Sequence, residues 1–149
     1  MLNIELQGLD EDGNEKTYKL SDFNGEQIIL YFYPKDNTSG CTQEACDFRD
    51  NINRLTNYAT VIGVSPDNIK SHKSFKEKQS LNFIILSDTE HKLAEELNVW
   101  KEKSMYGKKY MGIERSTFII DGKGKIQKEW RKVKVKGHVD EVIEYILNK

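Results

Sequence analysis

The chain has 149 residues, a formal net charge of −1 and 32% charged residues. A chain of this length can bury a core without disulfides or metals, so we expect one domain over residues 1–149. The near-zero charge excludes a general attraction to nucleic acid or to an acidic membrane, and the lack of a secretion signal or of an apolar span of roughly 18 residues predicts a cytoplasmic protein.

The first part of the chain is predicted to form a β-hairpin followed by a buried strand. Residues 4–6 and 17–20 flank the turn signal Asp10-Glu11-Asp12-Gly13, which predicts an N-terminal hairpin. The run from Ile28 to Tyr33 is apolar and rich in β-branched and aromatic residues, which predicts a buried strand that ends at Pro34.

A helix is predicted to begin close to Cys41, one of the two cysteines in the chain. The apolar residues of this helix recur at helical spacing, and Cys41 falls on the same face; they are Ala45, Phe48, Ile52 and Leu55. The first N–H groups of a helix lack internal partners, and the helix dipole adds partial positive charge there. A thiolate at Cys41 is therefore favoured over the thiol, which makes this residue a candidate nucleophile.

The charged residues close to Cys41 in the sequence do not help a thiolate. Four carboxylates outnumber two cations in this stretch; they are Asp36, Glu44, Asp47 and Asp50 against Lys35 and Arg49. We therefore expect a cation from elsewhere in the chain to lie beside Cys41.

The rest of the chain alternates predicted strands and helices. Strands are predicted at 60–65, 83–86, 116–120 and 125–130, with helices at 68–79, at 90–97 and at the C-terminus, where Val139, Val142, Ile143 and Ile146 share one face. Residues 100–112 show no clean period and are predicted to form a loop near the active site. This alternation predicts an α/β layer sandwich.

The other residues that could bind nucleic acid or a metal are better explained by structural roles. The lysines between residues 132 and 136 follow the period of a solvated or edge strand, and no aromatic residue is interleaved as in nucleic-acid binding. His72, His91 and His138 are scattered along the chain, and two cysteines separated by four residues lack the partner pair of a structural zinc site. We expect no metal.

Three segments of the sequence resemble the peroxiredoxins, specifically the bacterioferritin-comigratory (peroxiredoxin Q) branch. Residues 34–41, PKDNTSGC, fit the pattern Pro-x-x-x-Thr/Ser-x-x-Cys, and residues 41–50 resemble the helix of this branch, with its second cysteine at Cys46. Residues 112–121 resemble the segment that supplies the family's catalytic arginine. Two features depart from the branch: Ser39 replaces a usual proline, and the N-terminal Ala-Pro-Asp-Phe element is missing.

The resemblance implies a thioredoxin-like fold, with a mixed central sheet flanked by helices, and a thiol-dependent peroxidase. It assigns peroxide attack to Cys41, hydrogen bonding to Thr38, charge stabilisation to Arg115 and resolution through an intramolecular disulfide to Cys46. Pro34 and Gly40 would complete the peroxide pocket. It further implies a monomer recycled by thioredoxin or another external dithiol, without metal, haem or flavin.

Two other functions suit a thioredoxin-like fold with two cysteines. One is a thiol–disulfide oxidoreductase that acts on proteins, although its hallmark would be Cys-x-x-Cys, and the spacing here is longer. The other is a redox-sensing or partner-binding module without catalysis.

Overall fold

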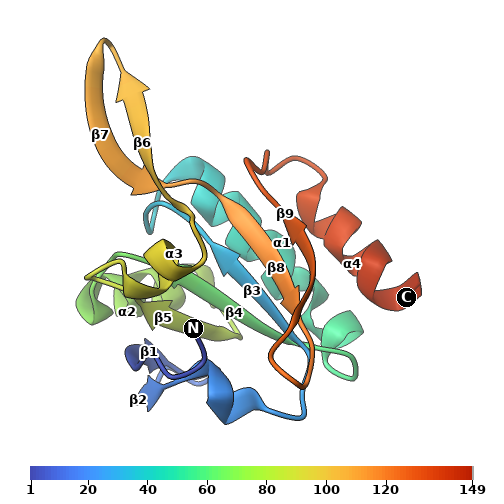
Figure 1. The fold of residues 1–149 in the computed structure, drawn as a ribbon. Helices are drawn as coiled ribbons and strands as arrows, with labels where there is room; N and C mark the ends of the chain where they lie inside the picture. The colour runs from blue at the N-terminus through green and yellow to red at the C-terminus, as the bar shows by residue number, and fades with distance from the viewer. Residues whose placement is uncertain (149) are drawn as a thin grey trace.

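The computed structural model describes residues 1–148, which form a seven-stranded mixed sheet, a separate two-stranded hairpin and flanking helices (Figure 1). The strands are β1 (Leu6–Leu9), β2 (Glu15–Tyr18), β3 (Ile28–Phe32), β4 (Thr60–Ser65), β5 (Ile84–Ser87), β6 (Trp100–Met105), β7 (Lys108–Ile113), β8 (Ser116–Ile120) and β9 (Ile126–Trp130). The helices are η1 (Leu20–Phe23), α1 (Ser39–Leu55), α2 (Ile69–Gln79), α3 (Lys92–Glu96) and α4 (His138–Asn148). Among the described helices, none is both long and apolar enough to cross a membrane.

The strand that leads to Cys41 lies in the middle of the sheet. The strand order is β2-β1-β5-β4-β3-β8-β9, in which β3 pairs in parallel with β4 and antiparallel with β8. Parallel neighbours need crossover connections, and α1 and α2 provide them between β3, β4 and β5. Every residue of β3 is buried, so the N-terminus of α1 is fixed at the carboxyl end of a buried strand.

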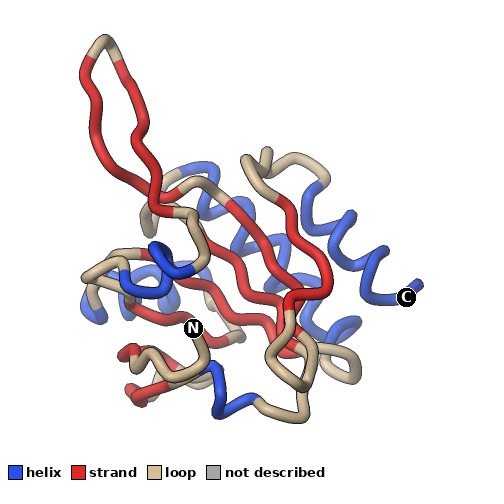
Figure 2. The backbone as a smooth tube through the Cα atoms, viewed as in Figure 1, coloured by secondary structure: helices blue, strands red, loops and turns tan. Residues whose placement is uncertain are grey.

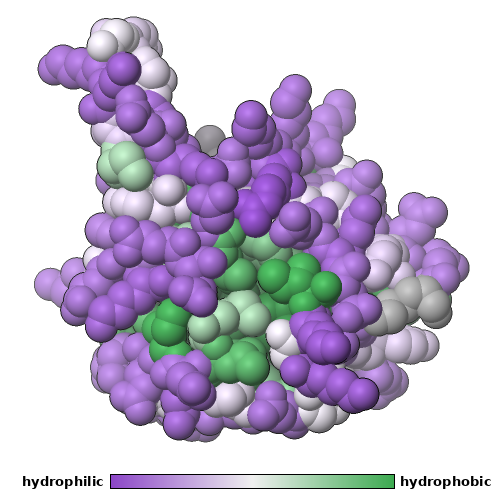
Figure 3. Space-filling model, viewed as in Figure 1, coloured by the Kyte–Doolittle hydropathy of each residue, from purple (hydrophilic) through white to green (hydrophobic). Residues whose placement is uncertain are grey.

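The two faces of the sheet have separate hydrophobic cores. Ile29 and Tyr31 point to the face covered by α1, α2 and α4, whereas Ile28, Leu30 and Phe32 point to the face covered by η1, α3 and the N-terminal segment. This alternation follows from the two-residue period of a strand. Figure 3 shows apolar side chains gathered over this second face, which carries only short elements.

The predicted α/β layer sandwich with an N-terminal hairpin is confirmed. The strand at residues 60–65 has the predicted bounds, and the hairpin strands are shifted along the chain to Leu6–Leu9 and Glu15–Tyr18. The four apolar residues of the C-terminal helix are all buried against the sheet, as their spacing predicted.

The predicted loop at residues 100–112 is wrong, because this stretch forms the β6–β7 hairpin. Its turn is Tyr106-Gly107, with φ values of 53° and 79°, as a two-residue turn of type I′ requires. The hairpin projects away from the body of the protein (Figure 2), and most of its residues are exposed. Since neither face of the hairpin is buried along its length, its sequence lacks the alternation of a half-buried strand.

The predicted strand in the lysine-rich run is also wrong. Residues 132–136 lie in the connection between β9 and α4, and Lys132 has a φ of 51°, outside the extended region. Trp130, at the end of β9, is held against α4, since its ring contacts the rings of His138 and Tyr145 edge-on.

Candidate active site

Cys41 lies in the first turn of α1, at the end of the loop that follows β3. The helix begins at Ser39, so Cys41 is its third residue, and the side chain is only 1% exposed. Thr38 is the N-cap residue with extended backbone angles, and its carbonyl accepts the N–H of Thr42 at 2.8 Å. Cys41 therefore takes the predicted position at a helix N-terminus, against the core.

Arg115 brings a guanidinium group to the Cys41 sulfur. It lies between β7 and β8, and its Nη2 donates to Cys41 Sγ at 3.3 Å. Its Nη1 donates to Glu44 Oε1 at 2.6 Å. One guanidinium thus faces the thiol and a carboxylate through two separate N–H groups, an arrangement that a lysine ammonium cannot reproduce.

Glu44 belongs to the site, although from the sequence it counted only as an unfavourable negative charge. Its side chain is fully buried, and its Oε2 has no hydrogen-bond partner among the described residues. Burial raises the pKa of Glu44 to about 7, although the Arg115 guanidinium opposes this shift. The available signal was its spacing, since a residue three positions after Cys41 lies on the same helix face.

Gly40 lies next to Arg115 at the start of the helix. A Cβ atom on Gly40 would stand 3.4 Å from Arg115 Nη2 and 3.9 Å from a methyl group of Val135. Both distances are ordinary van der Waals contacts, so Gly40 lies directly beside the guanidinium group of Arg115.

The loop before Cys41 is tied to the body of the protein through Asp36. Its buried carboxylate accepts hydrogen bonds from Tyr33 Oη at 2.6 Å and Ser71 Oγ at 2.8 Å, and its Oδ2 lies 2.6 Å from His72 Nδ1. Its backbone N–H donates to Asp67 Oδ2 at 2.7 Å. One residue therefore links this loop to Tyr33 directly after β3, to α2 and to the turn after β4.

Part of this network has the residue types of a metal site. Within residues 1–148, one group of His, Cys, Asp and Glu side chains has suitably close ligand atoms, namely Asp36, Asp67 and His72. The second His72 nitrogen lies 2.9 Å from the Leu86 carbonyl, which can only accept, so this nitrogen carries a proton. Since the ring and carboxylate atoms already have protein hydrogen-bond partners, the cluster fits a buried network and not a metal.

Thr38 and Pro34 lie in the loop where the resemblance places the peroxide pocket. Thr38 is exposed, and its Oγ1 donates to the Lys35 carbonyl at 3.0 Å. Among the described residues, no hydrogen bond joins Thr38 to Cys41, so its expected role toward the thiolate stays a prediction. Pro34 is half-buried at the start of the loop.

Cys46 lies on another flank of α1 and faces α2. It is half-buried, and its Sγ donates to Gln79 Oε1 at 3.6 Å. Both cysteines are free thiols, and α1 is unbroken between them. Residues five apart in a helix differ by about 7.5 Å of rise and 140° of rotation, which places their Cα atoms roughly 8.5 Å apart.

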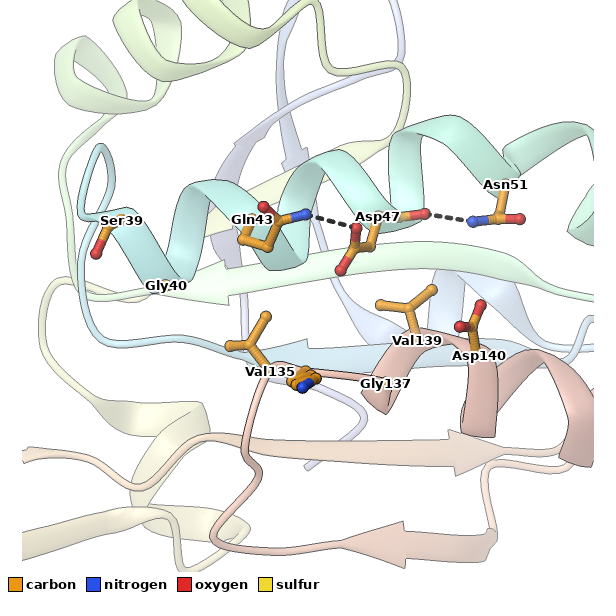
Figure 4. Close-up of a pocket in the computed structure, with 10 residues that line it drawn as sticks. Ser39, Gly40, Gln43, Asp47, Asn51, Val135, Gly137, Val139 and Asp140 are labelled. Carbon is orange, nitrogen blue, oxygen red and sulfur yellow. Dashed lines mark hydrogen bonds between the residues drawn. The ribbon is translucent and has the colours of Figure 1, made fainter.

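The opposite flank of α1 borders a groove instead of packed side chains. Figure 4 shows Gln43, Asp47 and Asn51 along this flank, facing the first turn of α4 across a groove of about 610 Å³. Their dashed hydrogen bonds stay within α1, since Gln43 and Asn51 both donate to Asp47. This side of the helix is therefore not tied to α4 by the polar groups that line the groove.

Comparisons with known proteins identify the family of the chain. A family model described as the AhpC/TSA family matches residues 1–129. The peroxiredoxin Bcp of Bacillus subtilis is 56% identical over 143 residues, which is 95% of this chain and 88% of the relative. Peroxiredoxin Bcp of Escherichia coli is 42% identical over 92% of this chain and 87% of its own length.

Solved structures show the same relationship in three dimensions. Peroxiredoxin Q of Xanthomonas campestris superposes with a TM-score of 0.89 at 39% identity, and covers 99% of this chain and 91% of its own. A structure of the bacterioferritin comigratory protein of the same organism, studied for its alkyl peroxide reduction activity, gives a TM-score of 0.89 at 38% identity and covers 99% of this chain and 92% of its own. The chain therefore belongs to the AhpC/TSA family of peroxiredoxins, in its bacterioferritin-comigratory, or peroxiredoxin Q, branch.

Proposed function

We propose that this peroxiredoxin reduces hydrogen peroxide and organic hydroperoxides with Cys41 as the attacking residue and Cys46 as the resolving residue. The observation that carries the proposal is the 3.3 Å contact between Arg115 Nη2 and the Cys41 sulfur at the N-terminus of α1. The X. campestris relative at 38% identity, studied for alkyl peroxide reduction, supports the same substrate class here.

In the first step, the Cys41 thiolate attacks one peroxide oxygen and the O–O bond breaks. The sulfur becomes a sulfenic acid, and the other oxygen takes up a proton and leaves as water or an alcohol. Arg115 stabilises first the thiolate and then the charge that develops on the leaving oxygen. The Thr38 hydroxyl is assigned to orient the peroxide, with Pro34 and Gly40 shaping the pocket.

In the second step, the Cys46 sulfur attacks the Cys41 sulfenic acid, and water leaves as the disulfide forms. A disulfide needs Cα atoms about 4.4–6.8 Å apart, less than the roughly 8.5 Å between these positions in an intact helix. Part of α1 must therefore unwind before this step. An external dithiol such as thioredoxin then reduces the disulfide, and the protein acts as a monomer in the cytoplasm.

The test is consumption of NADPH with thioredoxin and thioredoxin reductase, with and without hydrogen peroxide. Peroxide-dependent turnover supports the proposal, and a panel of organic hydroperoxides then ranks the substrates. Reduction of insulin without peroxide would instead identify a thiol–disulfide oxidoreductase. Silence in both assays would favour a redox-sensing module.

A further inference from the structure

We propose that the C-terminal end of α2 holds α1 closed around Cys46 and so sets how often the Cys41 sulfenic acid is resolved instead of over-oxidised. This inference rests on the proposed resolving role of Cys46. We call residues Gln79–Asn82 the α2 terminus. No step of the chemistry above uses these residues, yet they contact α1 in the region that must open.

Three hydrogen bonds join the α2 terminus to α1. Cys46 Sγ donates to Gln79 Oε1 at 3.6 Å, and Arg49 Nη1 donates to the Gln79 carbonyl at 2.7 Å. Asn82 Nδ2 donates to the Arg49 carbonyl at 3.3 Å. These bonds join residues 30 to 33 positions apart, so they tie two separate elements. They therefore oppose any unwinding of α1 that moves Cys46 or Arg49 away from α2.

The geometry makes the Cys46 contact a restraint and not an activation. The amide oxygen of Gln79 only accepts, so Cys46 must keep its proton to make this bond. A thiol that donates this bond is held on the flank of α1 that faces α2. Arg115 holds the first turns of α1 through Cys41 and Glu44, and the other flank of the helix faces the groove at Gln43. The α2 terminus adds the polar contacts at Cys46 and Arg49, one turn further along the helix.

The sulfenic acid has two competing fates. Attack by Cys46 forms the disulfide and releases water, whereas a second peroxide oxidises the sulfenic acid to a sulfinic acid and leaves as water or an alcohol. The first fate waits for α1 to open, and the second does not. Stronger ties at the α2 terminus therefore favour over-oxidation, and weaker ties favour the disulfide.

The test compares Gln79→Ala and Arg49→Met with the unmodified protein in single-turnover reactions with peroxide. Loss of the neutral contact should speed disulfide formation about threefold, and loss of the charge-assisted Arg49 contact about tenfold. The peroxide concentration that over-oxidises half of Cys41 should rise by the same factors. The rate of the first oxidation should not change. Circular dichroism and thermal unfolding show whether each variant is folded.

Two further variants distinguish a restraint on α1 from an electrostatic effect of Arg49 on the Cys46 thiol. Gln43→Ala removes a side-chain amide from the flank of α1 that borders the groove, where this amide bonds only within α1. This variant should leave the ratio of disulfide formation to over-oxidation unchanged. Arg49→Lys keeps the positive charge near Cys46 but loses the guanidinium group that bonds the Gln79 carbonyl. It should therefore also speed disulfide formation. If Arg49→Met instead slows this step and Arg49→Lys does not, the charge activates Cys46 and the proposal is wrong.

The unmodified protein distinguishes this inference from the proposed function. If it forms no peroxide-dependent bond between Cys41 and Cys46, the resolving role and the inference both fail. If it forms that bond and the Gln79→Ala and Arg49→Met variants match it in rate and in over-oxidation, the inference alone fails.

Discussion

Replacing Glu44 by glutamine should remove one of two opposing contributions to the pH dependence of stability. The buried carboxyl group has its pKa raised from 4.5 to about 7 by desolvation. The folded state therefore binds a proton between these pH values that the unfolded state has already released. Each pKa unit corresponds to about 1.4 kcal/mol, so the free energy of unfolding should fall by about 3 kcal/mol as the pH rises through this window.

A second buried group acts in the opposite direction and provides a matched control. Burial lowers the pKa of His138 from 6.5 to about 4, with a further contribution from the Arg115 charge. Here the unfolded state binds the extra proton, so the free energy of unfolding should rise by about 3 kcal/mol as the pH increases from 4 to 6.5. The two effects oppose each other in the unmodified protein. Replacing Glu44 leaves the effect of His138, and replacing His138 leaves the effect of Glu44.

The assay is urea unfolding under reducing conditions between pH 4.5 and 8, followed by tryptophan fluorescence. Glu44→Gln should gain stability relative to the unmodified protein as the pH rises to 7, and His138→Gln should lose it between pH 4.5 and 6.5. The glutamine amide keeps an oxygen that can accept the hydrogen bond of Arg115. Any change in the free energy of unfolding that does not depend on pH cancels when the pH dependence of the two proteins is compared. A difference between Glu44→Gln and the unmodified protein that stays constant across this range would refute the reasoning.

Three further results are expected. Cys41→Ser should abolish peroxide consumption, while Cys46→Ser should react once and stop as a sulfenic acid; equal loss of the first turnover in both would contradict these roles. Arg115→Ala should slow the first step at least tenfold, with partial rescue by Arg115→Lys, and an unchanged ultraviolet titration of the thiolate would remove Arg115 from the mechanism. Hydrogen exchange between residues 40 and 50 should accelerate only after oxidation; equal protection in both redox states, with the Cys41–Cys46 disulfide present, would show that α1 need not open.

The parts of the fold that bury side chains could be predicted from the sequence. The strand at residues 60–65 and the helix face at Val139 and Ile146 carry the hydrophobic pattern that burial imposes. The β6–β7 hairpin could not be predicted that way, because solvent surrounds most of it and its side chains follow no burial period. Its only local signal was the Tyr106-Gly107 turn.

Some residues of the site could be predicted from local sequence, and others could not. Cys41 could be found from the helix start alone, but Arg115 is 74 positions away and was identified only through the family motif. The spacing from Cys41 places Glu44 on the same helix face, but its pairing with that distant arginine has no local signal in the sequence. The contact between Cys46 and Gln79 had no sequence signal, since it depends on how two helices pack.

The anchoring of Asp36 has a mechanical consequence for the proposed cycle. The segment before Cys41 is stiff, because the buried contacts of Asp36 with Tyr33, His72 and Asp67 hold it to three parts of the protein. The segment after Cys41 is the part that has to yield. In the proposed cycle, Cys41 lies between a segment that stays fixed and a helical segment that unwinds. The loop where the peroxide pocket is expected therefore keeps its position through each turnover. After the disulfide is reduced, only α1 has to refold against the anchored loop. The expected pocket is then complete once Cys41 is again in the first turn of the helix.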